Sequence, residues 1–400
     1  MVDVRPLTFE EARAAVFKSV RESRAVPHIE RVSLLDAFGR VLASDVAADR
    51  DYPPVPRSIR DGFAVRSEDT PGTLRIVGEL RAGERATKNV GRGEAIEIMT
   101  GAPVPDGADA VVMIEHVERD ADLVRIGARA GAGQFVNPRA AESPRGEILV
   151  KQGKRLDYTD IAMLATVGAA TVEVFARPSV AIIPTGDEIV PVEASPQDHQ
   201  IRNSNVYSLA AQVRRAGGIP VMLPVARDEY EDTRSLVIRG LESDLLLLSG
   251  GVSAGKYDVV ESVLADLGAQ FVFDRVLIQP GQPLVFGRAA GKFFFGLPGN
   301  PASTIVTFEI FARAALELLA GECQPLLRTA WARLTKPFRH KPGLTRFLPA
   351  QWSEDGAELT PIPWNGSSDV PALTRANAFL IADAGCEQYQ AGDPMRVLPK

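Results

Sequence analysis

Apolar and polar positions follow one recurring order between residues 178 and 320. Short runs that are apolar at nearly every position alternate with longer stretches whose apolar residues recur every three or four positions. The runs predict strands at 179–183, 220–224, 245–248, 270–277, 284–287 and 293–297. The stretches predict helices at 204–216, 229–241, 259–267 and 302–319. Strands without a polar face are buried on both sides, so the pattern predicts a mainly parallel sheet between two helical layers, a three-layer α/β core.

The pattern changes on either side of this core. A capping box from Thr8 to Glu11 predicts a helix to about Arg21. A second helical stretch near 33–42 is expected to end around Gly39 and Arg40, and 158–167 predicts a helix that ends at Gly168. Short apolar runs separated by Gly, Pro and Asp turns predict small β domains before and after the core. We therefore expect a multidomain α/β plus β protein with four parts: an interrupted, extended mixed helical domain (1–45 and 147–177), a β insertion domain (46–146), the α/β core (178–323) and a C-terminal β-barrel-like domain (324–400).

The composition excludes several classes of protein. With 400 residues, of which 45% are hydrophobic and 24% charged, the chain is long enough for several globular domains. Its net charge of −6 disfavours nucleic-acid binding, which needs a basic face. The two cysteines, Cys323 and Cys386, exclude a disulfide framework and a cysteine zinc site. We see no signal-peptide pattern and no apolar run of about 20 residues, so we expect a cytoplasmic protein without a membrane partner.

Three glycine-rich loops with polar or acidic residues follow predicted strands, at 185–188, 249–255 and 296–301. The carboxyl ends of parallel strands meet at one edge of a sheet, where ligands bind. Backbone N–H groups in such loops suit phosphate, and neighbouring carboxylates suit Mg²⁺. A single such loop would mostly be a tight strand-to-helix turn that needs positive φ. Three together favour an enzyme that acts on a phosphorylated small molecule, and no P-loop motif is present.

Several acidic residues are candidates for this chemistry. Asp187 and Glu188 directly follow a predicted buried strand, where two carboxylates would be costly without a cation or a hydroxyl-rich ligand. Asp228 and Asp258 each precede a glutamate by three positions, so helix capping is an equal alternative for them. Two segments of the β insertion are, taken alone, typical of turns: 58–64 and 99–103.

Seven short segments occur in the order found in one enzyme family. They are 61–64 (Asp-Gly-Phe-Ala), 99–103 (Met-Thr-Gly-Ala-Pro), 184–188, 202–205 (Arg-Asn-Ser-Asn), 249–258, 280–283 (Pro-Gly-Gln-Pro) and 297–301 (Leu-Pro-Gly-Asn-Pro). On these motifs the chain resembles the molybdopterin molybdenumtransferases, the bacterial relatives of the gephyrin catalytic domain, over essentially its whole length.

The resemblance implies an elongated homodimer of four-domain subunits with active sites shared between subunits. It implies that adenylylated molybdopterin and molybdate are the substrates, that AMP and molybdenum cofactor are the products, and that Mg²⁺ assists. A molybdopterin adenylyltransferase is a further candidate partner. The core would be the molybdopterin-binding domain.

The resemblance also implies roles for single residues. The implied catalytic residues are Asp61, Thr100, Asp187, Glu188, Asp228 and Asp258. Of these, Asp187 and Asp258 would bind the metal, and Asp61 and Thr100 would come from the partner subunit. The residues expected around molybdate are Pro280, Ser303, Arg346 and Ser368. The other expected substrate contacts are Thr185, Gly186, Ser204, Asn205, Ser249, Gly250, Gly251, Ser253, Gly255, Gly281, Pro298, Gly299, Asn300 and Pro301.

The chain departs from the family pattern at Gln279 and Gln282, where lysines are common. A glutamine donates hydrogen bonds but carries no charge, so anion capture should weaken. This departure keeps a second hypothesis open, a non-catalytic homologue that binds molybdopterin or acts as a scaffold. A third is a related adenylyltransferase or nucleotide pyrophosphatase that shares the core, although the additional β domains argue against it.

Overall fold

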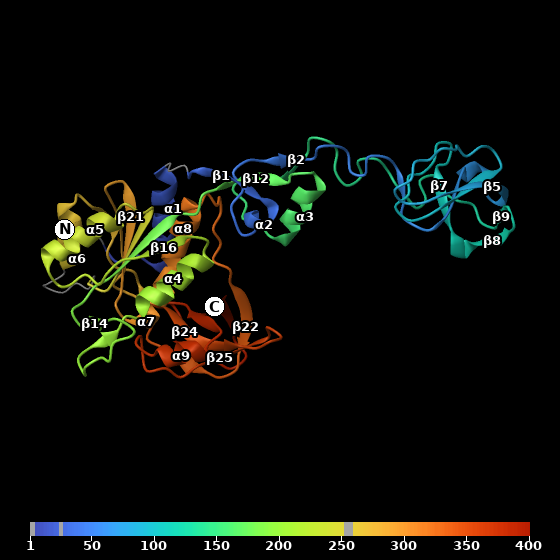
Figure 1. Ribbon diagram of the computed structural model, residues 1–400. Coiled ribbons are helices and arrows are strands. Elements are labelled where there is room, and N and C mark those ends of the chain that lie inside the picture. The colour runs from blue at the N-terminus through green and yellow to red at the C-terminus, as the bar shows by residue number, and fades with distance from the viewer. Residues whose placement is uncertain (1–4, 24–26, 252–258) are drawn as a thin grey trace.

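The chain has an elongated shape in the computed structural model, which describes residues 5–23, 27–251 and 259–400. The α/β core and a C-terminal barrel lie at one end, a small mixed domain lies in the middle, and the β insertion domain lies at the far end (Figure 1). This arrangement confirms the predicted multidomain α/β plus β class. None of the helices in the described ranges is long and apolar enough to cross a membrane.

The core is built on a six-stranded sheet in the order β16-β13-β17-β21-β20-β18. The first four strands are parallel, whereas β20 runs antiparallel to both of its neighbours. The strand bounds are β13 Ser179–Pro184, β16 Ile219–Met222, β17 Leu245–Ser249, β18 Gln270–Phe273, β20 Val285–Ala289 and β21 Lys292–Leu297. All six predicted strands are present, but β18 is shorter than predicted because the chain then leaves the sheet for β19 (Ile278–Gln279) in the barrel sheet.

Helices cover both faces of this sheet, as the apolar runs predict. Val180 and Ile182 pack in one cluster with α1, α4 and α7, whereas their neighbours Ala181 and Ile183 pack in a second cluster with α5 and α6. The helix bounds are α1 Phe9–Glu22, α4 Asn205–Arg215, α5 Tyr230–Gly240, α6 Val259–Asp266, α7 Pro301–Thr307 and α8 Arg313–Leu319. The predicted capping box of α1 is confirmed, and this helix packs on the core although the sequence groups it with the interrupted domain.

A π-helical segment, Phe308–Ala312, joins α7 to α8 within the predicted helix 302–319. This segment brings the buried Glu309 against α4, where its carboxylate accepts hydrogen bonds from Arg215 (2.5 Å) and Gln212 (3.2 Å). Arg313 donates to the other carboxylate oxygen at 2.6 Å. Glu309 therefore fixes α4 to the long C-terminal helix of the core.

Two chain segments far apart in sequence form the mixed domain. Strand β1 (Ile29–Ser33) pairs with β12 (Thr171–Phe175), and β2 (Val46–Ala47) pairs with β11 (Ile148–Val150). Two short helices cover them, α2 (Leu34–Ala37) and α3 (Tyr158–Thr166). The helical stretch predicted to end around Gly39 and Arg40 is present as α2, which ends at Ala37, two residues before Gly39. Gly39 has φ of +73°, a left-handed conformation that ends the helix.

The insertion domain and the C-terminal domain are both built from β-sheet. The insertion has the order β7-β4-β6-β5-β9-β8, with the bounds β4 Gly62–Val65, β5 Gly72–Leu80, β6 Glu94–Ile98, β7 Ala110–Met113, β8 Val117–Asp120 and β9 Leu123–Ile126. Its short strands β3 (Arg57–Ser58) and β10 (Val136–Asn137) also pair. In the C-terminal domain, five strands close into a barrel because β24 pairs with both β25 and β26. These strands are β22 Ala330–Leu334, β24 Thr345–Trp352, β25 Glu358–Pro361, β26 Ala378–Ala382 and β28 Pro394–Pro399.

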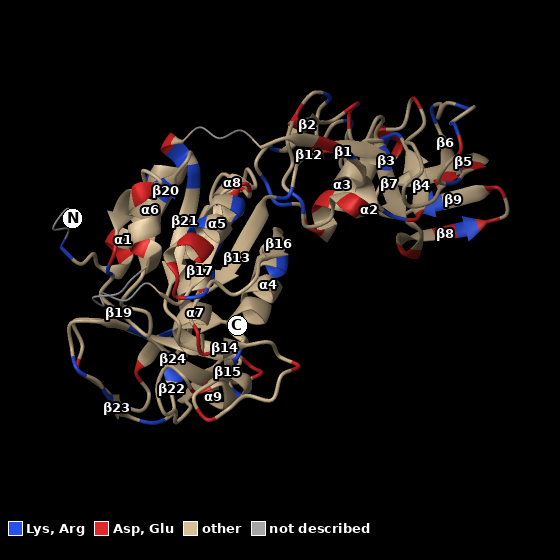
Figure 2. Cartoon of the chain, turned by 60° about the vertical axis from the view of Figure 1, so that its left-hand side comes forward, with Lys and Arg blue, Asp and Glu red and all other residues tan. Residues whose placement is uncertain are grey.

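The remaining elements are short. They are two 3₁₀ turns, η1 Ser67–Asp69 and η2 Ile114–His116, the pair β23 Phe338–Arg339 and β27 Gln388–Tyr389, the pair β14 Ile189–Val190 and β15 Ile201–Arg202, and α9 Val370–Arg375. Figure 2 shows the barrel elements below the carboxyl ends of the core strands. β19 pairs with β24, so the core and the barrel are joined directly at this edge.

Candidate functional site

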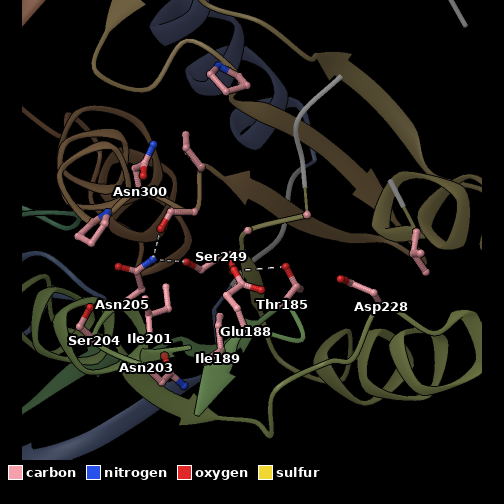
Figure 3. Close-up of a pocket in the computed structure, with 18 of the residues that line it drawn as sticks. Thr185, Glu188, Ile189, Ile201, Asn203, Ser204, Asn205, Asp228, Ser249 and Asn300 are labelled. Carbon is pink, nitrogen blue, oxygen red and sulfur yellow. Dashed lines mark hydrogen bonds between the residues drawn. The ribbon is translucent and has the colours of Figure 1, made fainter. Parts of the chain in front are cut away.

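A cleft of about 820 Å³ lies at the carboxyl ends of β13, β17 and β21. All three glycine-rich loops contribute to its wall, and Glu188, Gly251 and Asn300 line the same space. Figure 3 shows Asn205 and Asn300 on one side, Ser249 and Glu188 in the middle, and Asp228 on the other side. The residues of the loops that line it are Thr185, Gly186, Glu188, Ser249, Gly250, Gly251, Pro298, Gly299, Asn300 and Pro301. The convergence of the strand ends is thus as the sequence predicts.

Backbone hydrogen bonds connect the three loops. The Thr185 N–H donates to the Ser249 carbonyl at 3.0 Å, and the Gly250 N–H donates to the Leu297 carbonyl at 3.0 Å. Gly250 (φ +101°) and Gly251 (φ +60°) lie in the left-handed region. A Cβ at Gly250 would lie 2.7 Å from the Thr185 carbonyl oxygen, so this turn needs glycine.

Asn205, at the start of α4, ties two of the loops together. Its Nδ2 donates to Ser249 Oγ at 2.9 Å and to the Gly299 carbonyl at 2.7 Å (Figure 3). Its Oδ1 is buried and has no hydrogen-bond partner in the described structure. Ser204 also lines the cleft beside Asn205. Both residues, for which the resemblance implies substrate contacts, therefore lie in the wall of the cleft.

The carboxylates of the cleft differ from the sequence-based expectation. Glu188 and Asp228 line it, but Asp187 does not, although the Asp228 N–H donates to Asp187 Oδ1 at 3.4 Å. Asp187 and Glu188 are both exposed, because burial stops at Gly186. The argument that these two acids need a partner to offset desolvation is therefore wrong. Neither forms an ion pair with a described residue.

The described residues contain no group of three or more Asp, Glu, His or Cys side chains arranged to bind a metal. Asp258, the second expected metal ligand, lies outside the described residues, as do Ser253 and Gly255. The oxygen donors present at this edge are the exposed carboxylates of Asp187, Glu188 and Asp228. Such donors are the kind that Mg²⁺ prefers.

A second pocket of about 410 Å³ lies between the core and the barrel. It shares Pro283, Pro298 and Asn300 with the first cleft, so the two spaces adjoin. Of the residues expected around molybdate, Pro280 and Ser303 line it, and Gly281 does so as well. Ser368 does not, but its neighbour Ser367 lines the pocket and accepts a hydrogen bond from the Ala302 N–H at 2.9 Å.

Arg346 lies beside this second pocket without lining it. It is the register partner of Gln279 across β19 and β24, and Gln279 does line the pocket. The Nε of Arg346 is buried without a hydrogen-bond partner in the described part of the chain. Burial lowers the pKa of this guanidinium from its usual value. No charged side chain lines the second pocket among the described residues.

Asp61 and Thr100 lie together in the insertion domain, far from the cleft of the same chain. Asp61 Oδ1 accepts hydrogen bonds from the Thr100 N–H (2.6 Å) and the Thr100 hydroxyl (2.8 Å). These bonds, the backbone one foremost, hold the pKa of the Asp61 carboxyl below its usual value. Asp61 precedes β4, which pairs with β7 at the far end of the molecule (Figure 1). One chain therefore does not bring these residues to the core.

Sequence reasoning missed the pair β14 and β15, which extends from the first loop beside the cleft. This strand pair, and not a helix, follows Glu188. The pair brings Ile189, Ile201 and Arg202 into the cleft wall. Each strand has only two residues, which is too short for a periodic pattern. The signal that could have found Arg202 is its place within the motif 202–205.

Models of three related protein regions match the chain in succession. The MoeA N-terminal region (domain I and II) matches residues 7–168, a probable molybdopterin binding domain matches 181–318, and the MoeA C-terminal region (domain IV) matches 331–400. A molybdopterin molybdenumtransferase of Bacillus subtilis is 35% identical over 383 residues, covering 92% of this chain and 89% of the relative. The chain belongs to the MoeA family of molybdopterin molybdenumtransferases.

Other relatives agree with this assignment. The molybdopterin molybdenumtransferase of Staphylococcus aureus is 31% identical over 396 residues, covering 96% of this chain and 94% of the relative. Two solved structures of the molybdopterin biosynthesis MoeA protein from Pyrococcus horikoshii each cover 99% of this chain. The first has a TM-score of 0.77 and 32% sequence identity, and the match covers 99% of its chain. The second has a TM-score of 0.84 and 27% sequence identity, and the match covers 100% of its chain. The resemblance predicted from the motifs is confirmed.

Proposed function

We propose that this MoeA-family protein inserts molybdate into adenylylated molybdopterin, releasing AMP and forming molybdenum cofactor. The observation that carries the proposal is the pair of adjoining pockets at the carboxyl ends of the core strands. The larger one, of about 820 Å³, has the volume for a nucleotide-tagged pterin, and the smaller one, of about 410 Å³, has room for an oxyanion. The relatives named molybdopterin molybdenumtransferase support the same reaction.

In the larger cleft, Gly250 and Gly251 line the wall without side chains, so a phosphate group could come close to the backbone there. The carboxylates of Glu188 and Asp228 form its acidic side, and Asp187 lies next to Asp228, whose N–H donates to Asp187 Oδ1 at 3.4 Å. We assign Mg²⁺ to this side, with Asp187 and Asp258 as ligands. When bound, Mg²⁺ would neutralise charge on the phosphoanhydride oxygens while water cleaves the bond to AMP.

In the smaller pocket, molybdate would meet neutral hydrogen-bond donors. Gln279, Ser303 and Ser367 line it, and Arg346 lies beside Gln279 with its Nε unused. The two thiols of molybdopterin would bind molybdenum, and their two protons would leave with one oxo group as water. Pro298 and Asn300 line both pockets, so the pterin thiols and the oxyanion can meet at this wall.

The remote position of Asp61 and Thr100 motivates a homodimer in which the insertion domain of each subunit completes the partner's site. The elongated chain in Figure 1 separates these residues from their own cleft. We place the reaction in the cytoplasm, with a molybdopterin adenylyltransferase as the enzyme that supplies the adenylylated substrate.

A direct assay tests the proposal. The purified protein is incubated with adenylylated molybdopterin, Mg²⁺ and molybdate, and AMP release is followed together with reconstitution of an apo-molybdoenzyme. We expect both products, with AMP release dependent on Mg²⁺ and cofactor formation dependent on molybdate. No AMP release at high protein concentration would contradict the proposal.

The neutral lining of the second pocket favours one alternative, a homologue that binds molybdopterin without turnover. Tight pterin binding without AMP release would support it. The variant Gln279→Lys separates the two functions further. Restoring a cation beside the oxyanion should lower the molybdate concentration needed for half-maximal rate in an enzyme, and should change nothing in a scaffold that does not turn over.

A further inference from the structure

Two negative side chains and one positive side chain line the substrate cleft within the described residues. The negative ones are Glu188 and Asp228, and the positive one is Arg202. The adjoining pocket has no charged lining residue in the same part of the chain. The proposed substrate carries a phosphoanhydride, and the chain as a whole has a net charge of −6. An anion therefore enters a cleft whose background charge repels it, so a single placed cation has a large effect on binding.

The backbone around Arg202 is held in place by the short pair β14 and β15. Val190 is its register partner, and the Ile201 N–H donates to the Glu188 carbonyl at 2.9 Å. The Asn203 N–H donates to the Val190 carbonyl at 2.9 Å. Backbone hydrogen bonds of the residues before and after Arg202 therefore connect it to the segment that contains Glu188 and β14. Arg202 lies three residues before Asn205, where α4 begins.

One hydrogen bond orients the guanidinium of Arg202 and leaves its two Nη groups available. Its Nε donates to the Ala194 carbonyl at 2.9 Å. Neither Nη atom makes a hydrogen bond with a described residue, and Arg202 forms no ion pair with Glu188 or Asp228. A guanidinium with one fixed edge and one open edge matches two oxygens of a phosphate group.

The other nearby arginine has a different position. Arg227 donates through Nη1 to the Asp187 carbonyl at 3.1 Å, beside the acidic side of the site, and it does not line the cleft. The positive and negative groups of the cleft are therefore separated. The acidic groups come from the loops after β13 and before α5, and the cation comes from the β14–β15 pair.

We propose that Arg202 is a substrate-binding residue that grips the phosphate oxygens of the nucleotide-tagged pterin through its free Nη edge. This assignment rests on the proposed function, and it names the cation that the chain uses where Gln279 and Gln282 supply none. Arg202 binds the anion and takes no part in bond cleavage, so it acts mainly on Kd and KM.

Titration of the full-length protein with AMP and with adenosine tests the assignment. Arg202→Ala should raise the Kd for AMP by about 10- to 100-fold, because a hydrogen bond to a charged group is lost, while the affinity for adenosine stays the same. Arg202→Lys should restore part of the affinity. The difference between wild type and Arg202→Ala should shrink as salt rises from about 50 to 300 mM, because salt screens an exposed charge pair. Arg214→Ala is the matched control, since Arg214 is exposed on α4 outside the cleft and carries the same charge.

Kinetics with adenylylated molybdopterin then separate this assignment from the proposed function. We expect Arg202→Ala to raise KM by a similar factor and to leave kcat within about threefold. Equal AMP affinity in wild type and Arg202→Ala would overturn the role of Arg202, and AMP release by wild type would then leave the proposed function standing. A wild-type protein that releases no AMP from its substrate overturns the proposed function instead. A drop in adenosine affinity equal to the drop in AMP affinity would show a structural effect and also overturn the assignment.

Discussion

Replacement of Asn205 gives the sharpest test of how the cleft is assembled. Its amide joins the Ser249 loop to the Gly299 loop through two hydrogen bonds of 2.9 and 2.7 Å. A carbonyl oxygen only accepts, so the amide nitrogen must face Gly299. Asn205→Ala removes both bonds, each worth about 0.5–1.5 kcal/mol. The free energy that holds the two loops in this arrangement should therefore fall by about 1–3 kcal/mol. We expect kcat/KM for AMP release to drop by the corresponding factor, about 5- to 150-fold.

The variant Asn205→Asp makes the same test stricter. A carboxylate keeps the size of the side chain and can still accept from the Ser249 hydroxyl, but it places a negative oxygen against the Gly299 carbonyl. We expect Asn205→Asp to be less active than Asn205→Ala, because repulsion at this position adds to the loss of a donor. Ser249→Ala, which removes one of the two bonds, should be the mildest of the three.

The assay is the rate of AMP release, with far-UV circular dichroism and urea unfolding as controls that each variant is folded. Asn205 is the first residue of α4 and is partly exposed. We therefore expect the change in the free energy of unfolding to be smaller than the free-energy equivalent of the loss in kcat/KM. Activity of Asn205→Asp equal to wild type would refute the reasoning, because the two loops would then not depend on this amide.

Two further predictions concern other charged residues. Glu309→Gln should lower the free energy of unfolding by about 2 kcal/mol, because the buried carboxylate that binds Arg215 and Arg313 loses its charge. The control, Glu242→Gln on the surface, should change the free energy of unfolding by less than about 0.5 kcal/mol. Equal urea midpoints for the two variants would contradict a stabilising role of the buried network. Thr100→Val should raise the pKa of Asp61 toward its usual value without reaching it, since the Thr100 N–H remains. Because the folded pKa is depressed, this contact stabilises the insertion domain above a pH of about 4 and the stabilisation is lost as pH falls through the folded value. NMR titration of the Asp61 carboxyl checks the shift, and an unchanged pKa would exclude the hydroxyl as its cause.

The core could be predicted because its physical signal is strong. Leu245 to Leu248 are apolar on both faces, and only a strand between two helical layers buries all four. The loops that follow such strands had to converge, because parallel strands end at the same edge. The order of motifs then identified the family, which no periodicity could do.

The failures have equally local causes. The pattern near 33–42 predicts a helical stretch that ends around Gly39 and Arg40, and Gly39 does adopt positive φ, but the α-helix already ends at Ala37. The π-helical segment at 308–312 has the same apolar periodicity as the α-helix around it, so the pattern predicts one uninterrupted helix. The argument from Asp187 and Glu188 assumed that burial continues past the strand, whereas both carboxylates face water. Burial at a strand end is set by the neighbouring loops, which lie far away in sequence.

The wall formed by Pro298 and Asn300 separates two pockets at one edge of the sheet. These residues line the larger cleft on one side and the neutral pocket on the other. The Thr304 N–H donates to the Asn300 carbonyl at 3.0 Å, and Asn205 holds Gly299 between them, so the wall is fixed by the helices α4 and α7. Glu309 in turn joins α4 to the helix that continues α7. Because both pockets share this wall, we expect a displacement of Pro298 or Asn300 to change the shape of both pockets together.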